Sequence, residues 1–432
     1  MDEFAESLSY LGEEKDPLLR SLSKERDEKI AILDEGKIAT EEFLRRFPFM
    51  EKDPLIHNGY RYPSDKKMGG TLSYFAGAIS IQDPSSALPV EMLGIEDGDY
   101  VLDMCAAPGG KSIQAALMTP HGMVLSNDLS HQRALSLSQN IERMGLGNVM
   151  VTSLDLHELS SSLHGCFDKV ILDAPCSGEA LFRKMEEAKL DWDMDKVLRC
   201  AKTQKDLLSL ASVFLRDGGT LCYSTCSFSY EEDIGQIIEF LKENDDFELI
   251  EPADNPGFFH HQGLPKAIYL FPHRYRGEGQ FLALLRKKGN AARRSHPAKP
   301  DRLSSPCRQA IDSLGLAGPD KEISSSIEVL SAEGVEVKRG LLRFGAQVLD
   351  VSRKDILLAH GARFAPGLRV VELDESRAMR YLAGEEVEGE GKGYVALAYG
   401  PYRLGIGKAG QGKIKNRLPK GLRRKKGDIA LL

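Results

Sequence analysis

Short apolar runs alternate with helical stretches between residues 100 and 288, and this alternation organises the chain. The almost wholly apolar runs predict strands buried on both faces, at residues 100–102, 123–128, 148–152, 168–173, 220–226 and 281–285. The stretches between them predict helices that begin near Ile113 and cover residues 130–144, 203–215 and 230–242. Strands alternating with helices predict an α/β fold with a parallel sheet, in which ligands bind beyond the carboxyl ends of the strands.

The stretch DMCAAPGGKS, residues 103–112, joins the first predicted strand to the first helix. Its glycine pair lets the backbone turn sharply and approach a nucleotide-like ligand closely. The stretch contains neither the GxGxxG fingerprint of dinucleotide sites nor the GxxxxGK[ST] pattern of P-loops. By itself it is equally consistent with a glycine-rich turn that starts a helix.

Four acidic residues follow the ends of four different predicted strands: Asp103, Asp128, Asp155 and Asp173. Each one alone is a common helix cap or turn residue. Together, at the carboxyl edge of a parallel sheet, they favour a binding cleft. An acid after the second strand suits the hydroxyls of a ribose, so the pattern predicts a nucleoside-like cofactor.

Two of the seven cysteines belong to the same predicted edge, Cys176 after the fourth strand and Cys226 at the end of the fifth. Thiols in such positions are candidates for thiolate chemistry. A metal site on Cys222 and Cys226 is disfavoured, because four strand residues separate them by ~13 Å. A Cys176–Cys226 disulfide is geometrically possible but disfavoured in a reducing compartment. Other cysteines fit small buried residues, namely Cys166, Cys200 and Cys222.

Length and composition restrict the class of protein. A chain of 432 residues predicts two or three domains, at roughly 150 residues each. The net charge of −7 excludes a uniformly basic nucleic-acid-binding protein, so RNA affinity requires local basic patches. Unpaired cysteines and the lack of an apolar leader predict a reduced, cytoplasmic protein. No apolar run approaches the ~18 residues that a membrane span needs.

Composition also suggests domain boundaries. We expect an N-terminal module at residues 1–75, an α/β domain at 76–288, a basic linker at 289–306 and a further region at 307–432. Prolines and tyrosines at 48–63 predict an irregular segment. The last region shows a helix signal from Ala310 and strand signals at 328–330, 335–337, 368–371 and 394–399. Nine basic residues and no acid between Lys408 and Lys426 favour an RNA-contacting β-module over a solvated tail.

Three segments in register carry a resemblance to a known family: DMCAAPGGKS, DAPCSGEALFRK (173–184) and YSTCSFSYEED (223–233). They resemble the NOL/NOP/Sun family of S-adenosylmethionine-dependent RNA cytosine-5 methyltransferases, over about residues 81–281. The segment 405–423 resembles the PUA-like tail of bacterial members that modify small-subunit (16S) ribosomal RNA. The resemblance implies a Rossmann-like methyltransferase with a small N-terminal module and a C-terminal α+β, PUA-like RNA-binding region. It also implies S-adenosylmethionine as cofactor, 16S ribosomal RNA or the small subunit as partner, and neither a metal nor a membrane.

The resemblance also assigns roles to residues. A loop would surround the methionine part of the cofactor, made of Cys105, Ala106, Ala107, Pro108, Gly109, Gly110 and Lys111. Asp128 would hold the ribose, Asp155 the adenine edge, and Asp173 would lie between the cofactor and the target base. The family assigns attack on cytosine C6 to the cysteine of the TC motif, here Cys226, and product release to that of the PC motif, here Cys176. Spacing alone does not choose between them, since DNA cytosine-5 methyltransferases attack with the PC cysteine.

Some alternatives stay open at this point. Lys111, at a helix start, is also consistent with a plain solvated lysine. The family's R-x-N-x-L-K stretch is missing, because residues 29–37 read KIAILDEGK, so RNA contacts of the N-terminal module are not carried over. Transfer RNA or another structured RNA is an alternative substrate. A non-catalytic ribosome-assembly protein is the rival from another class, which the intact cysteine pair disfavours.

Overall fold

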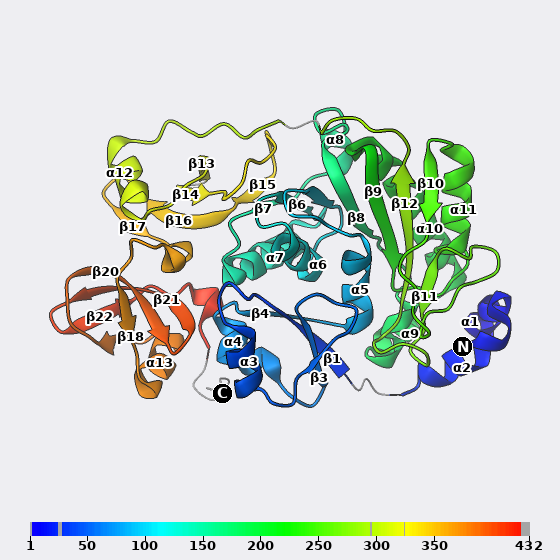
Figure 1. Cartoon of the computed structure of the whole chain (residues 1–432), viewed down its shortest axis with the longest axis horizontal. Helices are drawn as coiled ribbons and strands as arrows, with labels where there is room; N and C mark the ends of the chain where they lie inside the picture. The colour runs from blue at the N-terminus through cyan, green and yellow to red at the C-terminus, as the bar shows by residue number, and fades with distance from the viewer. Residues whose placement is uncertain (1, 25–27, 294–295, 324, 425–432) are drawn as a thin grey trace.

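A single large sheet forms the centre of the protein. The computed structural model describes residues 2–24, 28–293, 296–323 and 325–424. In this part of the chain the central sheet has nine strands in the order β10-β12-β9-β8-β5-β6-β7-β15, with β11 paired to β12 (Figure 1). The parallel strands are β5 (Tyr100–Asp103), β6 (Met123–Asn127), β7 (Val149–Thr152), β8 (Phe167–Asp173) and β9 (Leu215–Thr225). The antiparallel strands are β10 (Phe247–Ile250), β11 (Ile268–Leu270), β12 (Gln280–Lys287) and β15 (Leu341–Phe344).

Helices cover both faces of this sheet. On one face lie α5 (Pro84–Met92), α6 (Gly110–Met118) and α7 (His131–Met144). On the other lie α10 (Met194–Phe214) and α11 (Ile234–Glu243). Within β5, Leu102 packs into one core and Val101 into the other, which explains why the strand is apolar at successive positions. The predicted α/β fold with a sheet buried on both faces is therefore confirmed. The strand expected at residues 281–285 is not parallel, because it lies in β12, which pairs antiparallel with β9.

The first residues of the chain belong to the central domain, although we expected them in an N-terminal module. They form α1 (Asp2–Ser7), η1 (Leu8–Glu14) and α2 (Lys15–Ser21), beside α9 and α11 in Figure 1. Phe4 and Leu8 are buried in the core that α10 and α11 share. The Phe4 ring lies 5.1 Å from that of Phe182 and 5.2 Å from that of Trp192.

A separate four-stranded sheet follows, in the order β2-β3-β1-β4. It consists of β1 (Glu28–Leu33), β2 (Glu51–Lys52), β3 (Gly59–Pro63) and β4 (Ile79–Gln82), with α3 (Thr40–Arg46), η2 (Met68–Gly70) and α4 (Leu72–Phe75). Part of the segment that we expected to be irregular is strand β3. Tyr60 and Tyr62 are buried because they alternate onto one face. The sheet continues to Gln82, past the boundary expected at residue 75.

The C-terminal region contains two small sheets. The first has the order β13-β14-β16-β17: β13 (Asp320–Ile323), β14 (Ser326–Val329), β16 (Ala346–Val351) and β17 (Ile356–Leu358), after α12 (Ser305–Ser313). The second has the order β18-β20-β21-β22-β19: β18 (Val370–Glu372), β19 (Val387–Glu388), β20 (Gly393–Tyr399), β21 (Tyr402–Gly410) and β22 (Lys413–Asn416), with η4 (His360–Phe364) and α13 (Glu375–Leu382). The strand expected at 335–337 is wrong, since Val335 makes only an isolated bridge with Pro297. Lys425 and Lys426 lie outside the described residues.

The C-terminal region and the central domain are not independent. Strand β15 leaves that region and pairs antiparallel with β7, which places Phe344 opposite Met150. A further core joins the N-terminal sheet to the second C-terminal sheet, and Ser73 Oγ lies 2.6 Å from the Tyr402 hydroxyl. No helix of the described residues is long and apolar enough to span a bilayer.

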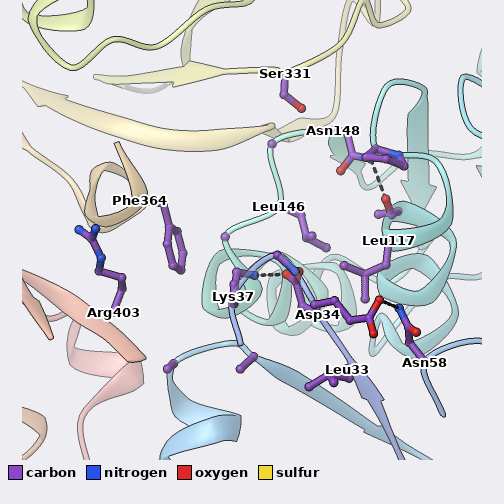
Figure 2. A pocket seen from close by; sticks show the side chains of 18 of the residues that line it. Leu33, Asp34, Lys37, Asn58, Leu117, Leu146, Asn148, Ser331, Phe364 and Arg403 are labelled. Atoms are coloured by element: carbon purple, nitrogen blue, oxygen red, sulfur yellow. Dashed lines mark hydrogen bonds and ion pairs between the residues drawn. The ribbon is translucent and has the colours of Figure 1, made fainter. Parts of the chain in front are cut away.

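All three parts meet at the carboxyl end of α7. Lys37 donates to the carbonyl of Met144 and pairs with Asp34 at 2.6 Å. Arg363 Nη2 donates to the carbonyl of Arg143 at 2.6 Å. Cations at a helix carboxyl end satisfy its last carbonyls. Beside them opens a cavity of about 790 Å³, and Figure 2 shows side chains that line it, among them Lys37, Leu146 and Phe364.

Candidate active site

The loop between β5 and α6 borders a cavity of about 560 Å³ at the carboxyl edge of the sheet. Gly109 has φ +110°, and a Cβ at this position would lie 2.8 Å from Leu137 Cδ1. Only glycine therefore fits here without strain. Gly110 begins α6, and its carbonyl accepts a hydrogen bond from Gln82 Nε2 at 3.0 Å. Most of the predicted cofactor loop lines this cavity: Cys105, Ala106, Ala107, Pro108, Gly110 and Lys111.

Lys111 is not a solvated helix-start residue. Its side chain is 8% exposed, and its Nζ lies 2.8 Å from both Asp173 Oδ2 and Ser86 Oγ. Burial alone would lower the pKa of Lys111, but the neighbouring carboxylates of Asp173 and Asp103 outweigh burial and raise it. The cation is therefore held against Asp173 inside the cavity.

Asp173 receives hydrogen bonds from three different elements. Besides Lys111 on Oδ2, Ser224 Oγ and Gln280 Nε2 donate to its Oδ1 at 2.8 and 2.9 Å. The Asp173 side chain is still 34% exposed, so a fixed carboxylate faces the cavity. Sequence reasoning missed Gln280. Its only local signal is a polar residue at the start of the apolar run QFLALL, and the pairing of β12 with β9 brings it to the site.

The two cysteines of the PC and TC motifs lie in contact, with 3.1 Å between their sulfur atoms. Both are free thiols and partly buried. They line a second cavity of about 750 Å³, which shares Cys105, Ala107, Asp173, Leu181 and Cys226 with the first. The hydrogen bond to Cys226, together with burial, raises the pKa of Cys176 well above its usual value. The Cys176 thiol therefore keeps its proton beside the Cys226 sulfur.

The other strand-end acids lie in different surroundings. Asp128 is buried and accepts hydrogen bonds from the backbone N–H groups of Ala107 (3.2 Å) and Ser130 (3.0 Å). Asp155 is exposed and caps helix α8 (Leu156–Leu159) through the His157 N–H at 3.0 Å. Neither acid is among the described residues that line the two cavities. Asp128 thus supports the cofactor loop, and both contacts expected with the nucleoside stay predictions.

Asp103, at the end of β5, is buried at the wall of the first cavity. Its Oδ2 accepts a hydrogen bond from Ser112 Oγ at 2.6 Å, whereas its Oδ1 has no partner among the described residues. Burial raises the pKa of Asp103 to about 7.

The cavity of about 790 Å³ beside the carboxyl end of α7, shown in Figure 2, is a poorer candidate for the active site. None of its lining residues is a cysteine, and Lys37 and Arg363 beside it are used to cap α7. Within the described ranges, no group of three or more His, Cys, Asp or Glu side chains is placed to hold a metal ion. Among the described residues, the two cysteines and the glycine-containing loop 103–112 lie together only at the carboxyl edge of the central sheet.

Comparisons with known proteins agree with this placement. The family described as 16S rRNA methyltransferase RsmB/F matches residues 90–286, and the one described as methyltransferase RsmF PUA domain matches residues 368–424. Ribosomal RNA small subunit methyltransferase F of Vibrio cholerae (strain ATCC 39315 / El Tor Inaba N16961) is 32% identical over 433 residues, which cover 90% of each chain. Its namesake from Shewanella sp. (strain MR-4) is 31% identical and covers 85% of this chain and 84% of its own.

Solved structures share the fold. A methyltransferase homolog protein from Pyrococcus horikoshii is 27% identical with a TM-score of 0.56, and the match covers 64% of this chain and 91% of that one. The structure of NSun6 from the same organism with SFG, an analogue of S-adenosylmethionine, has a TM-score of 0.60 at 20% identity. That match covers 67% of this chain and 99% of the other, and it shows the fold alone.

Fold and site together define a Rossmann-like S-adenosylmethionine-dependent methyltransferase with a C-terminal PUA-like domain. Within this class, the chain belongs to the RsmB/F family of 16S rRNA methyltransferases and carries a PUA domain of the RsmF type. The family expected from the three motifs and the basic tail is confirmed.

The first cavity suits S-adenosylmethionine chemically. Its methionine end carries an ammonium and a sulfonium, and Asp103 Oδ1, which has no partner among the described residues, offers a hydrogen-bond acceptor in the cavity wall. The backbone at Gly109 and Gly110 leaves room for close approach of a ligand. The cofactor loop would hold the methionine end, and when bound the cofactor supplies an electrophilic methyl group.

Proposed function

We propose that this protein methylates C5 of cytosine in small-subunit (16S) ribosomal RNA, with Cys226 as the nucleophile and Cys176 as the residue that assists release. One observation carries the proposal. Two free thiols lie 3.1 Å apart beside the Asp173–Lys111 pair, in cavities that the loop between β5 and α6 borders.

Cytosine chemistry explains the need for a thiolate. C5 of cytosine is a weak nucleophile, and addition of the Cys226 sulfur to C6 makes C5 enamine-like. As the S–C6 bond forms, the C5–C6 π electrons shift toward C5 and the ring nitrogen N3. C5 would then take the methyl group of the sulfonium, and the electrons of the methyl–sulfur bond would stay on the departing sulfur, which leaves as a neutral thioether. A base afterwards removes the C5 proton, those electrons restore the C5–C6 double bond, and the C6–S bond breaks. The enzyme and the 5-methylcytosine then separate.

Cys176 and Asp173 assist the last and the first step of this reaction, respectively. Because Cys176 keeps its proton, its thiol can donate a hydrogen bond to the Cys226 sulfur as that sulfur leaves C6. The carboxylate of Asp173 faces the cavity and would stabilise a proton at N3 of the ring, which makes C6 more electrophilic. Lys111 positions that carboxylate through its 2.8 Å contact.

The choice of substrate rests on the family and on the C-terminal domain. Relatives whose matches cover 85% and 90% of the chain are named for small-subunit ribosomal RNA, and the PUA domain match covers residues 368–424. Exposed lysines on β21 and β22 offer contacts to phosphates. The target cytosine has to leave its stack to reach Cys226. The proposal includes a cytoplasmic location, which the free cysteines support.

The direct test is incubation with S-adenosylmethionine carrying a labelled methyl group and 16S ribosomal RNA. Label at cytosine C5 is the expected result, and label at any other atom overturns the proposal. Transfer RNA serves as the comparison substrate. Methylation of transfer RNA in preference to 16S RNA would leave the chemistry standing and overturn the substrate.

Substitution of each cysteine tests the division of roles. We expect Cys226→Ala to lose methylation completely, since no nucleophile remains. Cys176→Ala should instead accumulate a covalent protein–RNA adduct that survives denaturing electrophoresis, because attack proceeds while release is blocked. The opposite pattern would exchange the two assignments.

A further inference from the structure

Each cysteine of the site is followed by a buried serine, and the same two carboxylates bind both serines. Ser177 follows Cys176 and donates to Glu232 through its backbone N–H at 2.9 Å. Its hydroxyl also lies within hydrogen-bond distance of Glu232 and, at 3.1 Å, of Glu179. Ser227 follows Cys226, and its hydroxyl donates to Glu232 at 2.8 Å and lies 3.3 Å from Glu179.

The side chains of Glu179 and Glu232 form their hydrogen bonds with these loops and the elements next to them. Both side chains are buried, and within the described residues neither forms an ion pair with a lysine, arginine or histidine. Their remaining hydrogen-bond donors come from nearby elements: Trp192, Gln204, Phe228 and Ser229. Burial raises the pKa of both carboxyl groups. Buried acids are costly unless hydrogen-bonded, and a satisfied network of this kind selects one arrangement of the loops.

Backbone hydrogen bonds join the same two loops on either side of the nucleophile. The N–H of Ala180, in η3 (Glu179–Arg183), donates to the carbonyl of Cys226 at 3.0 Å. The N–H of Ala174 donates to the carbonyl of Ser224 at 2.9 Å. These bonds align the loops, whereas the two carboxylates hold the residues directly after the sulfur-bearing positions.

We propose that Glu179 and Glu232 are positioning residues that clamp together the loop after β8, which carries Cys176, and the loop after β9, which carries Cys226. This clamp sets the contact between the two sulfur atoms. For its effect on catalysis, this inference rests on the proposed function. The separation of the sulfurs is measurable without RNA or cofactor. Misplacement of a reacting group by about 1 Å costs on the order of 10²-fold in rate, so loss of the clamp should act mainly on kcat.

The experiment uses phenylarsine oxide, which bridges two adjacent thiols through arsenic with release of one water molecule. Bridging is followed by mass spectrometry of the full-length protein, and peptide mapping separates Cys176 and Cys226 from Cys105. The variants are Glu232→Ala, Glu232→Gln and Ser177→Ala. Glu328→Gln is the matched control, because Glu328 is also a buried carboxylate that accepts a backbone N–H but lies on β14.

We expect wild type and Glu328→Gln to bridge Cys176 to Cys226 at equal rates. Glu232→Ala should bridge these thiols roughly tenfold more slowly and lose on the order of 10² in kcat, with the KM for S-adenosylmethionine within about twofold. Ser177→Ala should show a smaller loss of the same kind. Glu232→Gln should recover much of both properties, because an amide of the same shape still accepts from the Ser177 N–H. A purely structural role would not produce this parallel rescue.

Wild-type bridging rates and wild-type kcat in both Glu232→Ala and Ser177→Ala would overturn the inference. If Glu232→Ala does not fold by circular dichroism, Ser177→Ala decides the question. Slower bridging in the variants, together with a wild type that methylates no cytosine, would support the clamp and overturn the proposed function. Methylation at C5 with bridging unaffected by the variants would overturn the clamp alone.

Discussion

At the scale of single residues, the site depends on how Asp173 is held. Its carboxylate accepts hydrogen bonds from Lys111 on α6, Ser224 on β9 and Gln280 on β12. Three donors from three elements leave the side chain little freedom to rotate, although it is open to the cavity. A carboxylate fixed in this way can act on a substrate without having to reorient first.

Replacing Gln280 with leucine tests this arrangement. The change keeps the volume of the side chain and removes one of the three donors, so Asp173 should be less well oriented. A hydrogen bond to a charged group contributes about 1.5–3 kcal/mol, which corresponds to a loss of roughly 10- to 100-fold in kcat on RNA. The KM for S-adenosylmethionine should change little. A kcat equal to that of wild type would show that Gln280 has no part in orienting Asp173.

Asp103 gives a prediction about pH. Its pKa in the folded protein is about 7, above the ~3.9 of an unfolded chain, so the folded state holds an extra proton between these values. The contribution of Asp103 to the free energy of unfolding is therefore present at low pH and is lost as the pH rises through 7. The free energy of unfolding falls by no more than about 1.4 kcal/mol per pH unit. Relative to Asp103→Asn, the melting temperature of wild type should fall between pH 5 and pH 8. Parallel curves for the two proteins would contradict this account.

At the scale of elements, the order of strands decides which residues meet. Cys176 and Cys226 lie 50 positions apart in sequence, and the parallel pairing of β8 with β9 brings the loops after them together. The antiparallel pairing of β12 with β9 adds Gln280 to the same edge. Strand β15 extends the opposite edge, with Phe344 1% exposed in the main core.

Phe344→Ala should therefore destabilise the methyltransferase domain, although the residue comes from the C-terminal region. Removal of a buried phenylalanine costs about 3–5 kcal/mol, through lost apolar contact and the cavity left behind. Amide hydrogen exchange in β7, which pairs with β15, should speed up along with the loss of stability. Val370→Ala, at a residue 40% exposed on β18, is the control. Unchanged exchange in β7 would mean that β15 contributes little to the central sheet.

At the scale of the whole molecule, charge is unevenly distributed. The chain has a net charge of −7, yet strands β21 and β22 bring exposed lysines side by side. Lys408 pairs in register with Lys415, and Lys413 follows the turn between the strands. The N-terminal sheet shares a hydrophobic core with this domain, so the basic strands are held firmly to the rest of the protein.

Changing Lys408, Lys413 and Lys415 together to glutamine should weaken RNA binding at low salt. Each lost phosphate contact should reduce the slope of log K against log salt by about 0.7, the value for a single strand. Affinity for S-adenosylmethionine should stay the same, because the cofactor loop is in another domain. Lys205→Gln is the control, since Lys205 already pairs with Glu239 and Glu243. A slope that does not change would place the RNA on another face.

From the sequence alone it was possible to predict the α/β fold, the glycine turn after the first parallel strand and the two cysteines at the carboxyl edge of the sheet. These depend on local features: apolar runs, glycine where the backbone must turn, and residue types at strand ends. Tertiary structure alone decided the contacts of Glu179, Glu232 and Gln280, the packing of α1 and the insertion of β15. Their partners are distant in sequence, and neither periodicity nor local motifs specify which distant elements pair.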